Sequence, residues 1–112
     1  MNEGSVIRFA LQQNDGKLVK RPALIVKRIP PHNDYLICGI SKSIGLAVKG
    51  LDLIITENDS DFNTWGLNYP GLIRCGWLYT VSSKYIEGAL GNVSPESYNT
   101  ILSNLTSFLS RQ

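Results

Sequence analysis

The chain has 112 residues, of which 43% are hydrophobic and 18% charged, and its formal net charge is +2. This length fits a single domain over residues 1–112, which can bury a core without disulfides or metal ions. No apolar run approaches the ~18 residues of a membrane span and no signal peptide is visible, so we expect a cytoplasmic protein that does not bind membranes. The small net charge does not by itself mark a nucleic-acid-binding protein.

Hydrophobic alternation predicts a series of short strands. Asn14-Asp15-Gly16 lies at the centre of a polar loop and is a hairpin signal. Pro22 then opens a continuously apolar strand with Arg21 at its mouth, because proline is tolerated as the first residue of a strand. The predicted strands are residues 4–11, 22–29, 35–41, 51–55, 72–81 and 87–93.

Only the end of the chain has a clear helical pattern. Ser94 is a preferred N-cap residue, Pro95 suits the first helical position, and apolar side chains then recur at helical spacing to about residue 110. Many short strands followed by one amphipathic helix, about 94–110, favour a mainly β fold: a small, strongly bent barrel with a C-terminal helix packed on it.

Two arginines at predicted strand ends suggest an anion site. Arg21 precedes an apolar strand, and Arg74 stands among apolar neighbours in Leu72-Ile73-Arg74-Cys75. A guanidinium group can hold two phosphate oxygens at once and keeps its charge. The alternatives are an ion pair of Arg21 with Asp15 and a buried salt bridge of Arg74 with Glu57 or Asp61.

Other side chains are candidates to support such a site. Ser41 ends the third predicted strand, and its hydroxyl can bond either the local backbone or a phosphate. Trp65 and Tyr69 fall in a predicted loop, where stacking on bases competes with packing, whereas Trp77 is expected in the core. Cys38 and Cys75 lie in apolar runs and are expected to be buried free thiols, so neither a metal site nor a cofactor is predicted.

Several of these segments, in this order and spacing, resemble the PemK/MazF toxins of type II toxin–antitoxin systems, in a divergent branch of that family. The likeness runs from Gly4 to the final helix. The matching pieces are Gly4-Ser5-Val6, Gly16, residues 21–26, residues 38–41, Gly66-Leu67, residues 72–75, Thr80-Val81 and residues 91–94.

The resemblance implies an SH3-like barrel of the CcdB/PemK/MazF type that forms a homodimer. It further implies an endoribonuclease that cleaves single-stranded RNA at short sequences, without a metal ion, and that a cognate antitoxin inhibits. Arg21 and Arg74 match the two arginines of the family, and Ser41 stands where the family often has a threonine. The family usually has an acid in the first loop shortly before the arginine; this chain has none at that spot, and Asp15 is the only acid of the loop. Lys20, Lys42, Trp65 and Tyr69 are the expected RNA-binding side chains.

A second departure also bears on catalysis. PemK-type members carry an aspartate two residues after the second arginine, and this chain has Gly76 there. RNA cleavage through the 2′-hydroxyl needs a base, so either Asp15 or an acid of the 57–61 loop replaces that aspartate, or the arginines act with little help, or catalysis is lost.

The alternative function is therefore a catalytically degenerate barrel that still binds an antitoxin or RNA. A gyrase poison like CcdB shares the fold, but its activity resides in a C-terminal Trp-Gly-Ile, whereas this chain ends Leu109-Ser110-Arg111-Gln112.

Overall fold

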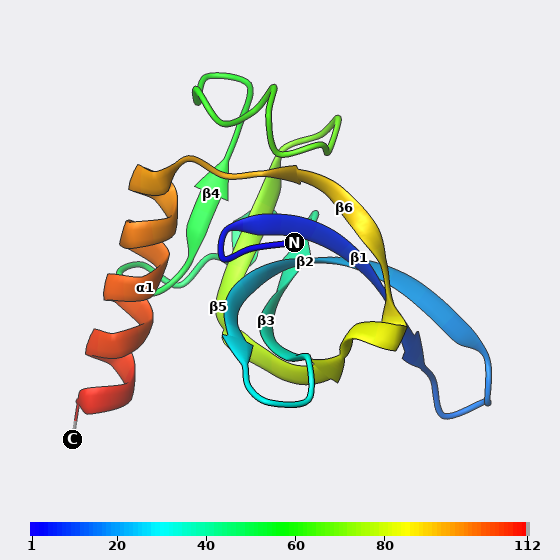
Figure 1. Ribbon diagram of the computed structural model, residues 1–112. Coiled ribbons are helices and arrows are strands. Elements are labelled where there is room, and N and C mark those ends of the chain that lie inside the picture. The colour runs from blue at the N-terminus through cyan, green and yellow to red at the C-terminus, as the bar shows by residue number, and fades with distance from the viewer. Residues whose placement is uncertain (112) are drawn as a thin grey trace.

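The computed structural model describes residues 1–111 and consists of one antiparallel sheet and a C-terminal helix (Figure 1). The six strands follow the order β4-β5-β3-β2-β1-β6 across the sheet, and 3-10 turns lie at Ile44–Leu46 and Ser83–Tyr85. The expected mainly β fold with a C-terminal helix is confirmed. The elements are β1 (Ser5–Gln12), β2 (Leu18–Ile29), β3 (Asp34–Ser41), β4 (Leu53–Ile55), β5 (Gly71–Ser82), β6 (Ile86–Asn92) and α1 (Pro95–Ser110).

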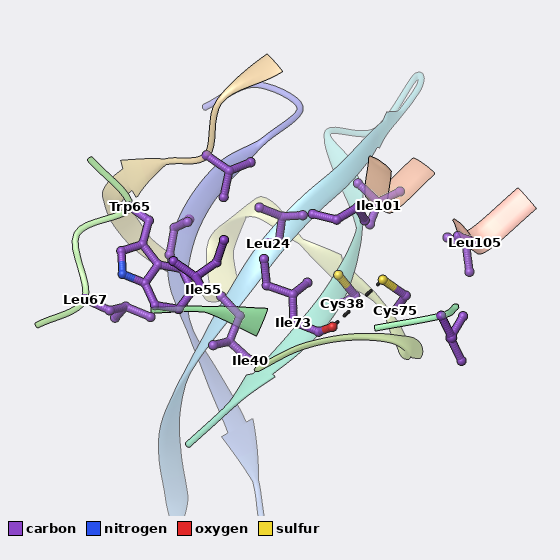
Figure 2. Close-up of a cluster of buried hydrophobic side chains, with 14 residues drawn as sticks. Leu24, Cys38, Ile40, Ile55, Trp65, Leu67, Ile73, Cys75, Ile101 and Leu105 are labelled. Atoms are coloured by element: carbon purple, nitrogen blue, oxygen red, sulfur yellow. Dashed lines mark hydrogen bonds between the residues drawn. The ribbon is translucent and has the colours of Figure 1, made fainter. Parts of the chain in front are cut away.

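The sheet curls into a half-barrel, and α1 lies along one side of it (Figure 1). Since successive strand residues face opposite sides, the sheet buries two apolar clusters. The larger one lies beneath α1, which contributes Ile101 and Leu105, and contains Trp65 and both cysteines (Figure 2). The smaller one consists of Ile7, Phe9, Ala23, Ile25, Tyr35 and Ile37.

The first two strands form a ribbon that is longer than predicted. β2 begins at Leu18 and not at Pro22, so the expectation that Arg21 stands at the mouth of the strand is wrong. Residues 18–21 pair with β1, whereas the ladder with β3 begins only at Ala23. Pro22 is accommodated because it lies beyond the end of the β3 ladder, where no strand requires its missing N–H.

A large bulge interrupts β5 where it pairs with β3. Arg74 is opposite Gly39 and Leu78 is opposite Cys38, so Cys75, Gly76 and Trp77 have no partner residues on β3. The Asp52 carboxylate, just before β4, accepts a hydrogen bond from the Cys75 N–H at 3.0 Å and another from the Val48 N–H at 2.9 Å. Asp52 therefore holds the bulge and the loop after β3 together.

The start of α1 is held by its own cap and by a buried carboxylate. The Ser94 hydroxyl accepts a hydrogen bond from the Ser97 N–H at 3.1 Å, as expected for an N-cap. Asp61, which is only 3% exposed, accepts hydrogen bonds from the Ser94 N–H and from both serine hydroxyls. A carboxylate at this end of a helix is favoured by the helix dipole. Within residues 1–111 no helix combines the length and hydropathy that a membrane crossing requires.

Candidate functional site

A groove with a volume of about 490 Å³ opens where the ribbon of β1 and β2 extends past the end of the β3 ladder. Its floor includes Phe9, Leu11 and Tyr79, which belong to or pack on the smaller apolar cluster. The remaining lining residues are Arg21, Pro22, Gly39, Ile40, Ser41, Lys42, Ser43, Tyr69 and Trp77.

Strand register explains why Arg21 and Ser41 share this groove. Arg21 pairs with Phe9 of β1, so both side chains lie on the same face of the sheet. Ala23 pairs with Gly39 of β3, and continuing that register by two residues brings Arg21 opposite Ser41. The Ser41 hydroxyl accepts a hydrogen bond from the Ser43 N–H at 3.0 Å and retains its own proton for a ligand.

The bulge of β5 builds the wall that carries Trp77. The indole ring lies so close to Gly39 that a Cβ atom there would stand 2.6 Å from the Cε3 atom of Trp77. The Arg74 guanidinium lies over the same ring, with its carbon 4.7 Å from the ring centre. Arg74 itself is half-buried, does not line the groove, and is held beside it through Trp77. The alternative, a salt bridge of Arg74 with Glu57 or Asp61, is not observed, because the one ion pair among residues 1–111 joins Lys20 and Glu87.

A second cation and aromatic ring form another wall of the groove. The Lys42 ammonium lies 4.6 Å from the centre of the Tyr69 ring, and both residues line the groove. Such contacts hold a lysine side chain in place while its charge stays available to an anion. Two further ring pairs, Trp77 with Tyr79 at 6.2 Å and Phe9 with Tyr79 at 5.8 Å, extend the aromatic surface across the floor.

Lys20 and Asp15, two more of the expected site residues, lie outside the groove. Lys20 follows Val19 on the face opposite Arg21 and pairs with Glu87 of β6 at 3.1 Å. Asp15 is exposed in the turn that ends the ribbon and accepts a hydrogen bond from the Lys17 N–H. Because the last strand pair is Gln12 with Leu18, Asp15 is separated from Arg21 by at least ~10 Å at 3.3 Å per residue.

Trp65, which is predicted to bind RNA, lies in the core. Its side chain is 0% exposed and belongs to the cluster beneath α1 (Figure 2), where Gly71 makes room for the ring. Trp77, which was expected in the core, is instead 45% exposed and lines the groove. Trp77 is exposed because the bulge turns it outward. Trp65 is buried because the loop before β5 folds against the sheet.

The groove is cationic and its lining contains no carboxylate. Arg21 and Lys42 contribute positive charge, and the hydroxyls of Ser41, Ser43, Tyr69 and Tyr79 supply neutral donors and acceptors. Asp52 and Asp61 are engaged in backbone and cap hydrogen bonds outside it. Within residues 1–111 no three His, Cys, Asp or Glu side chains gather as a metal-binding group. The arrangement suits an extended anion with flat apolar parts.

Both cysteines are free and buried, as predicted. Burial, with the nearby Asp52 carboxylate, raises the pKa of Cys75 to about 12, and burial is also the main cause of the raised pKa of Cys38. Neither thiol is therefore a nucleophile at neutral pH.

The fold can be compared with solved structures, although no family model and no curated protein matches the sequence. An endoribonuclease of mycobacterial species, in complex with its cognate antitoxin, superposes with a TM-score of 0.73 at 19% identity, covering 100% of this chain and 97% of that one. The Mycobacterium tuberculosis toxin MazF-mt6 gives a TM-score of 0.71 at 14% identity over 96% and 98% of the two chains. The MazE-MazF complex of Deinococcus radiodurans gives 0.69 at 12% identity over 100% and 97%.

This chain has the MazF fold. The resemblance seen in the sequence is thus confirmed for the fold over essentially the whole chain.

Proposed function

We propose that this chain is the toxin of a type II toxin–antitoxin system, a sequence-specific endoribonuclease that cleaves single-stranded RNA through the 2′-hydroxyl without a metal ion. One observation carries the proposal: in a MazF fold, Arg21, Ser41 and Lys42 share one groove with Tyr69 and Trp77. Cations that follow a phosphate backbone and rings on which bases stack are the two elements of single-strand recognition.

The proposed reaction requires stabilisation of a phosphorane-like transition state. The 2′-oxygen attacks the adjacent phosphorus, the bond to the 5′-oxygen breaks, and the products are a 2′,3′-cyclic phosphate and a 5′-hydroxyl. In our proposal Arg21 and Lys42 hold the phosphate oxygens, the Ser41 hydroxyl donates to one of them, and Arg74 supplies charge from beside Trp77. Preorganised donors of this kind each contribute about 3–4 kcal/mol of transition-state stabilisation.

No carboxylate of residues 1–111 lines the groove to act as the general base. Asp15 is the one acid carried by the ribbon that bears Arg21, but it lies at the ribbon's tip. Asp61 is held at the start of α1 by three hydrogen-bond donors. We therefore propose that the cations carry most of the catalysis, with Asp15 as the base only if the ribbon brings it over the groove.

The absence of a carboxylate from the groove lining favours a second candidate. In it, the chain is a catalytically degenerate barrel that binds RNA or an antitoxin but does not cleave. Both candidates are cytoplasmic and share the same groove.

The proposed partners follow from the fold and its edges. The mycobacterial endoribonuclease and the Deinococcus radiodurans MazF are each in complex with an antitoxin, and we propose that a cognate antitoxin inhibits this chain. We also propose a homodimer, because β4 and β6 end the sheet and exposed edges invite pairing.

The deciding experiment is cleavage of unstructured RNA by the purified chain, with the 5′-hydroxyl products identified by labelling. Arg21→Ala should reduce the rate by about 10²–10³-fold. Arg8→Ala is the matched control, because Arg8 is exposed on β1 next to Phe9 and so faces the other side of the sheet. A wild type that binds RNA tightly but never cleaves it would establish the degenerate barrel instead.

A further inference from the structure

Trp77 is an exposed aromatic side chain whose position depends on a bulge in β5 and on a glycine in β3. A bulge of Cys75, Gly76 and Trp77 leaves the ladder with β3, and the Asp52 carboxylate receives the N–H that the bulge frees. The chain carries glycine at position 39, where any Cβ atom would collide with the indole ring. These features present a large apolar ring at 45% exposure inside a cationic groove.

Packing alone does not account for this placement. Burial is the ordinary reason to keep a tryptophan, and Trp65 shows it at 0% exposure in the core of the same chain. Trp77 belongs to neither of the two buried clusters. Its fixed neighbours are Gly39 and the Arg74 guanidinium, and Tyr79 lies beside it with ring centres 6.2 Å apart.

We propose that Trp77 is the base-stacking platform of a one-nucleotide subsite, in which a single unpaired base lies on the indole ring while its phosphate is held by Arg21 and Lys42. This inference rests on the proposed function and adds to it the residue that receives the base. All three side chains line the same groove.

The size and charge of the groove fit one nucleotide. Its volume of about 490 Å³ lies within the ~300–1,000 Å³ typical of small-ligand sites. The cations stand on β2 and just after β3, and the aromatic rings that line the same groove come from β1 (Phe9) and β5 (Trp77 and Tyr79). The Arg74 guanidinium lies over the indole ring and increases the positive potential around a base stacked there.

The two tryptophans make the subsite directly measurable. Trp77 is the accessible one and Trp65 is fully buried, so quenching of intrinsic fluorescence by a bound oligonucleotide reports on Trp77. The probe is a mixed-sequence eight-nucleotide single-stranded DNA, which lacks the 2′-hydroxyl and cannot be cleaved. An abasic oligonucleotide of the same length keeps the phosphates and removes every base.

We expect the DNA probe to quench Trp77 and the abasic probe to bind without quenching. Trp77→Leu should weaken binding of the DNA probe about five- to a hundredfold, as for loss of one stacked base, with the affinity for the abasic probe unchanged. Trp77→Phe should recover most of the affinity. Tyr85→Leu is the matched control: Tyr85 is 47% exposed with the Lys84 ammonium 5.1 Å from its ring centre, and it does not line the groove.

The RNA and DNA experiments together distinguish a failure of base stacking on Trp77 from a failure of the proposed ribonuclease function. If the wild type cleaves RNA while Trp77→Leu keeps the wild-type KM and DNA affinity, stacking on Trp77 is overturned and the ribonuclease stands. Equal quenching by the DNA and abasic probes also overturns it. If the wild type neither cleaves RNA nor binds either probe, the proposed function and the subsite fall together.

Discussion

The indole ring of Trp77 lies against the backbone of Gly39, so closely that a Cβ atom at position 39 would stand 2.6 Å from Cε3 of the ring. These two residues come from neighbouring strands, and the contact exists because the bulge in β5 returns Trp77 over the residue that pairs with Arg74. The contact ties the aromatic wall of the groove to the strand that ends in Ser41.

Gly39→Ala should displace the Trp77 ring, because the backbone on which it lies cannot retreat within a central strand. We expect a loss of about 1–3 kcal/mol in the free energy of unfolding, as for overpacking, and weaker RNA binding. Urea denaturation and RNA titration measure the two effects. Gly76→Ala is the control, since a Cβ there meets only Leu51 Cδ2 at an ordinary 3.6 Å. Equal effects of the two substitutions would contradict the role of the Gly39 contact.

Arg74→Ala should abolish most RNA cleavage while the protein stays folded. The expected loss is about 10²–10³-fold. The fold should survive because the ion pair found among residues 1–111 joins Lys20 and Glu87, so no carboxylate loses its partner. Arg74→Lys should recover little, since an ammonium does not stack on the Trp77 ring as a planar guanidinium does. Rates are compared at equal concentrations of folded protein, and full activity of the lysine variant would count against a role for the planar guanidinium on Trp77.

Features that depend on neighbouring residues were readable from the sequence. The cap formed by Ser94 and Pro95 is set by local hydrogen bonds, and α1 begins at Pro95 and ends at Ser110, close to the predicted 94–110. Alternation also located all six strands to within a few residues, because each strand buries at least part of one face. Arg21 and Ser41, which were both predicted to lie at strand ends and to bind an anion, share one groove.

Features that depend on distant partners were not readable. The bulge of β5 is stabilised by Asp52, which accepts a hydrogen bond from the N–H of Cys75, 23 residues later in the chain. No local sequence pattern predicts that contact. The predicted strand therefore put Trp77 in the core. Trp65 lies in a loop, as predicted, but that loop folds onto Gly71 of β5 and buries the ring. The glycines at 39 and 71 were the available signals, since each leaves the space that a tryptophan fills.

Asp52→Asn should loosen the bulge. The side-chain amide retains one acceptor, so one of the two hydrogen bonds, from Cys75 or from Val48, is lost. We expect a loss of about 1–3 kcal/mol in the free energy of unfolding, because a partly buried N–H is left without a partner. Urea denaturation measures it, and acrylamide quenching should show Trp77 more accessible. Asp59→Asn, in an exposed turn with Thr56, is the control and should change both quantities little.

Mutation of Asp61 should lower stability, whereas mutation of Asp15 should not. Asp61→Ala removes the acceptor for three donors at the start of α1, and we expect it to lower the free energy of unfolding by about 2 kcal/mol. Cleavage per folded molecule should stay unchanged.

Asp15→Asn should leave stability and cleavage nearly unchanged, because Asp15 lies outside the groove. A loss of cleavage of about 10²–10⁴-fold in Asp15→Asn, at unchanged RNA affinity, would instead identify Asp15 as the base.

Gly76→Asp tests whether a missing base limits the reaction. The position is exposed, lies between Arg74 and Trp77 in the bulge, and accepts a Cβ atom without a clash. The carboxylate would stand where PemK-type proteins carry an aspartate after their second arginine. We expect the rate of RNA cleavage to rise, by as much as about 10²–10⁴-fold if proton removal from the 2′-hydroxyl is rate-limiting. The gain should appear in kcat and should fall away at acid pH as the new carboxylate becomes protonated.

Gly76→Asn is the matched control, because it has the same size and hydrogen-bonding reach but cannot take a proton as a carboxylate does. If the two variants cleave at equal rates, the added charge is irrelevant and the cations carry the reaction. If Gly76→Asp cleaves more slowly than Gly76→Asn, the new carboxylate has neutralised Arg74 instead of activating the 2′-hydroxyl. That result would place Arg74 nearer to position 76 than to the scissile phosphate.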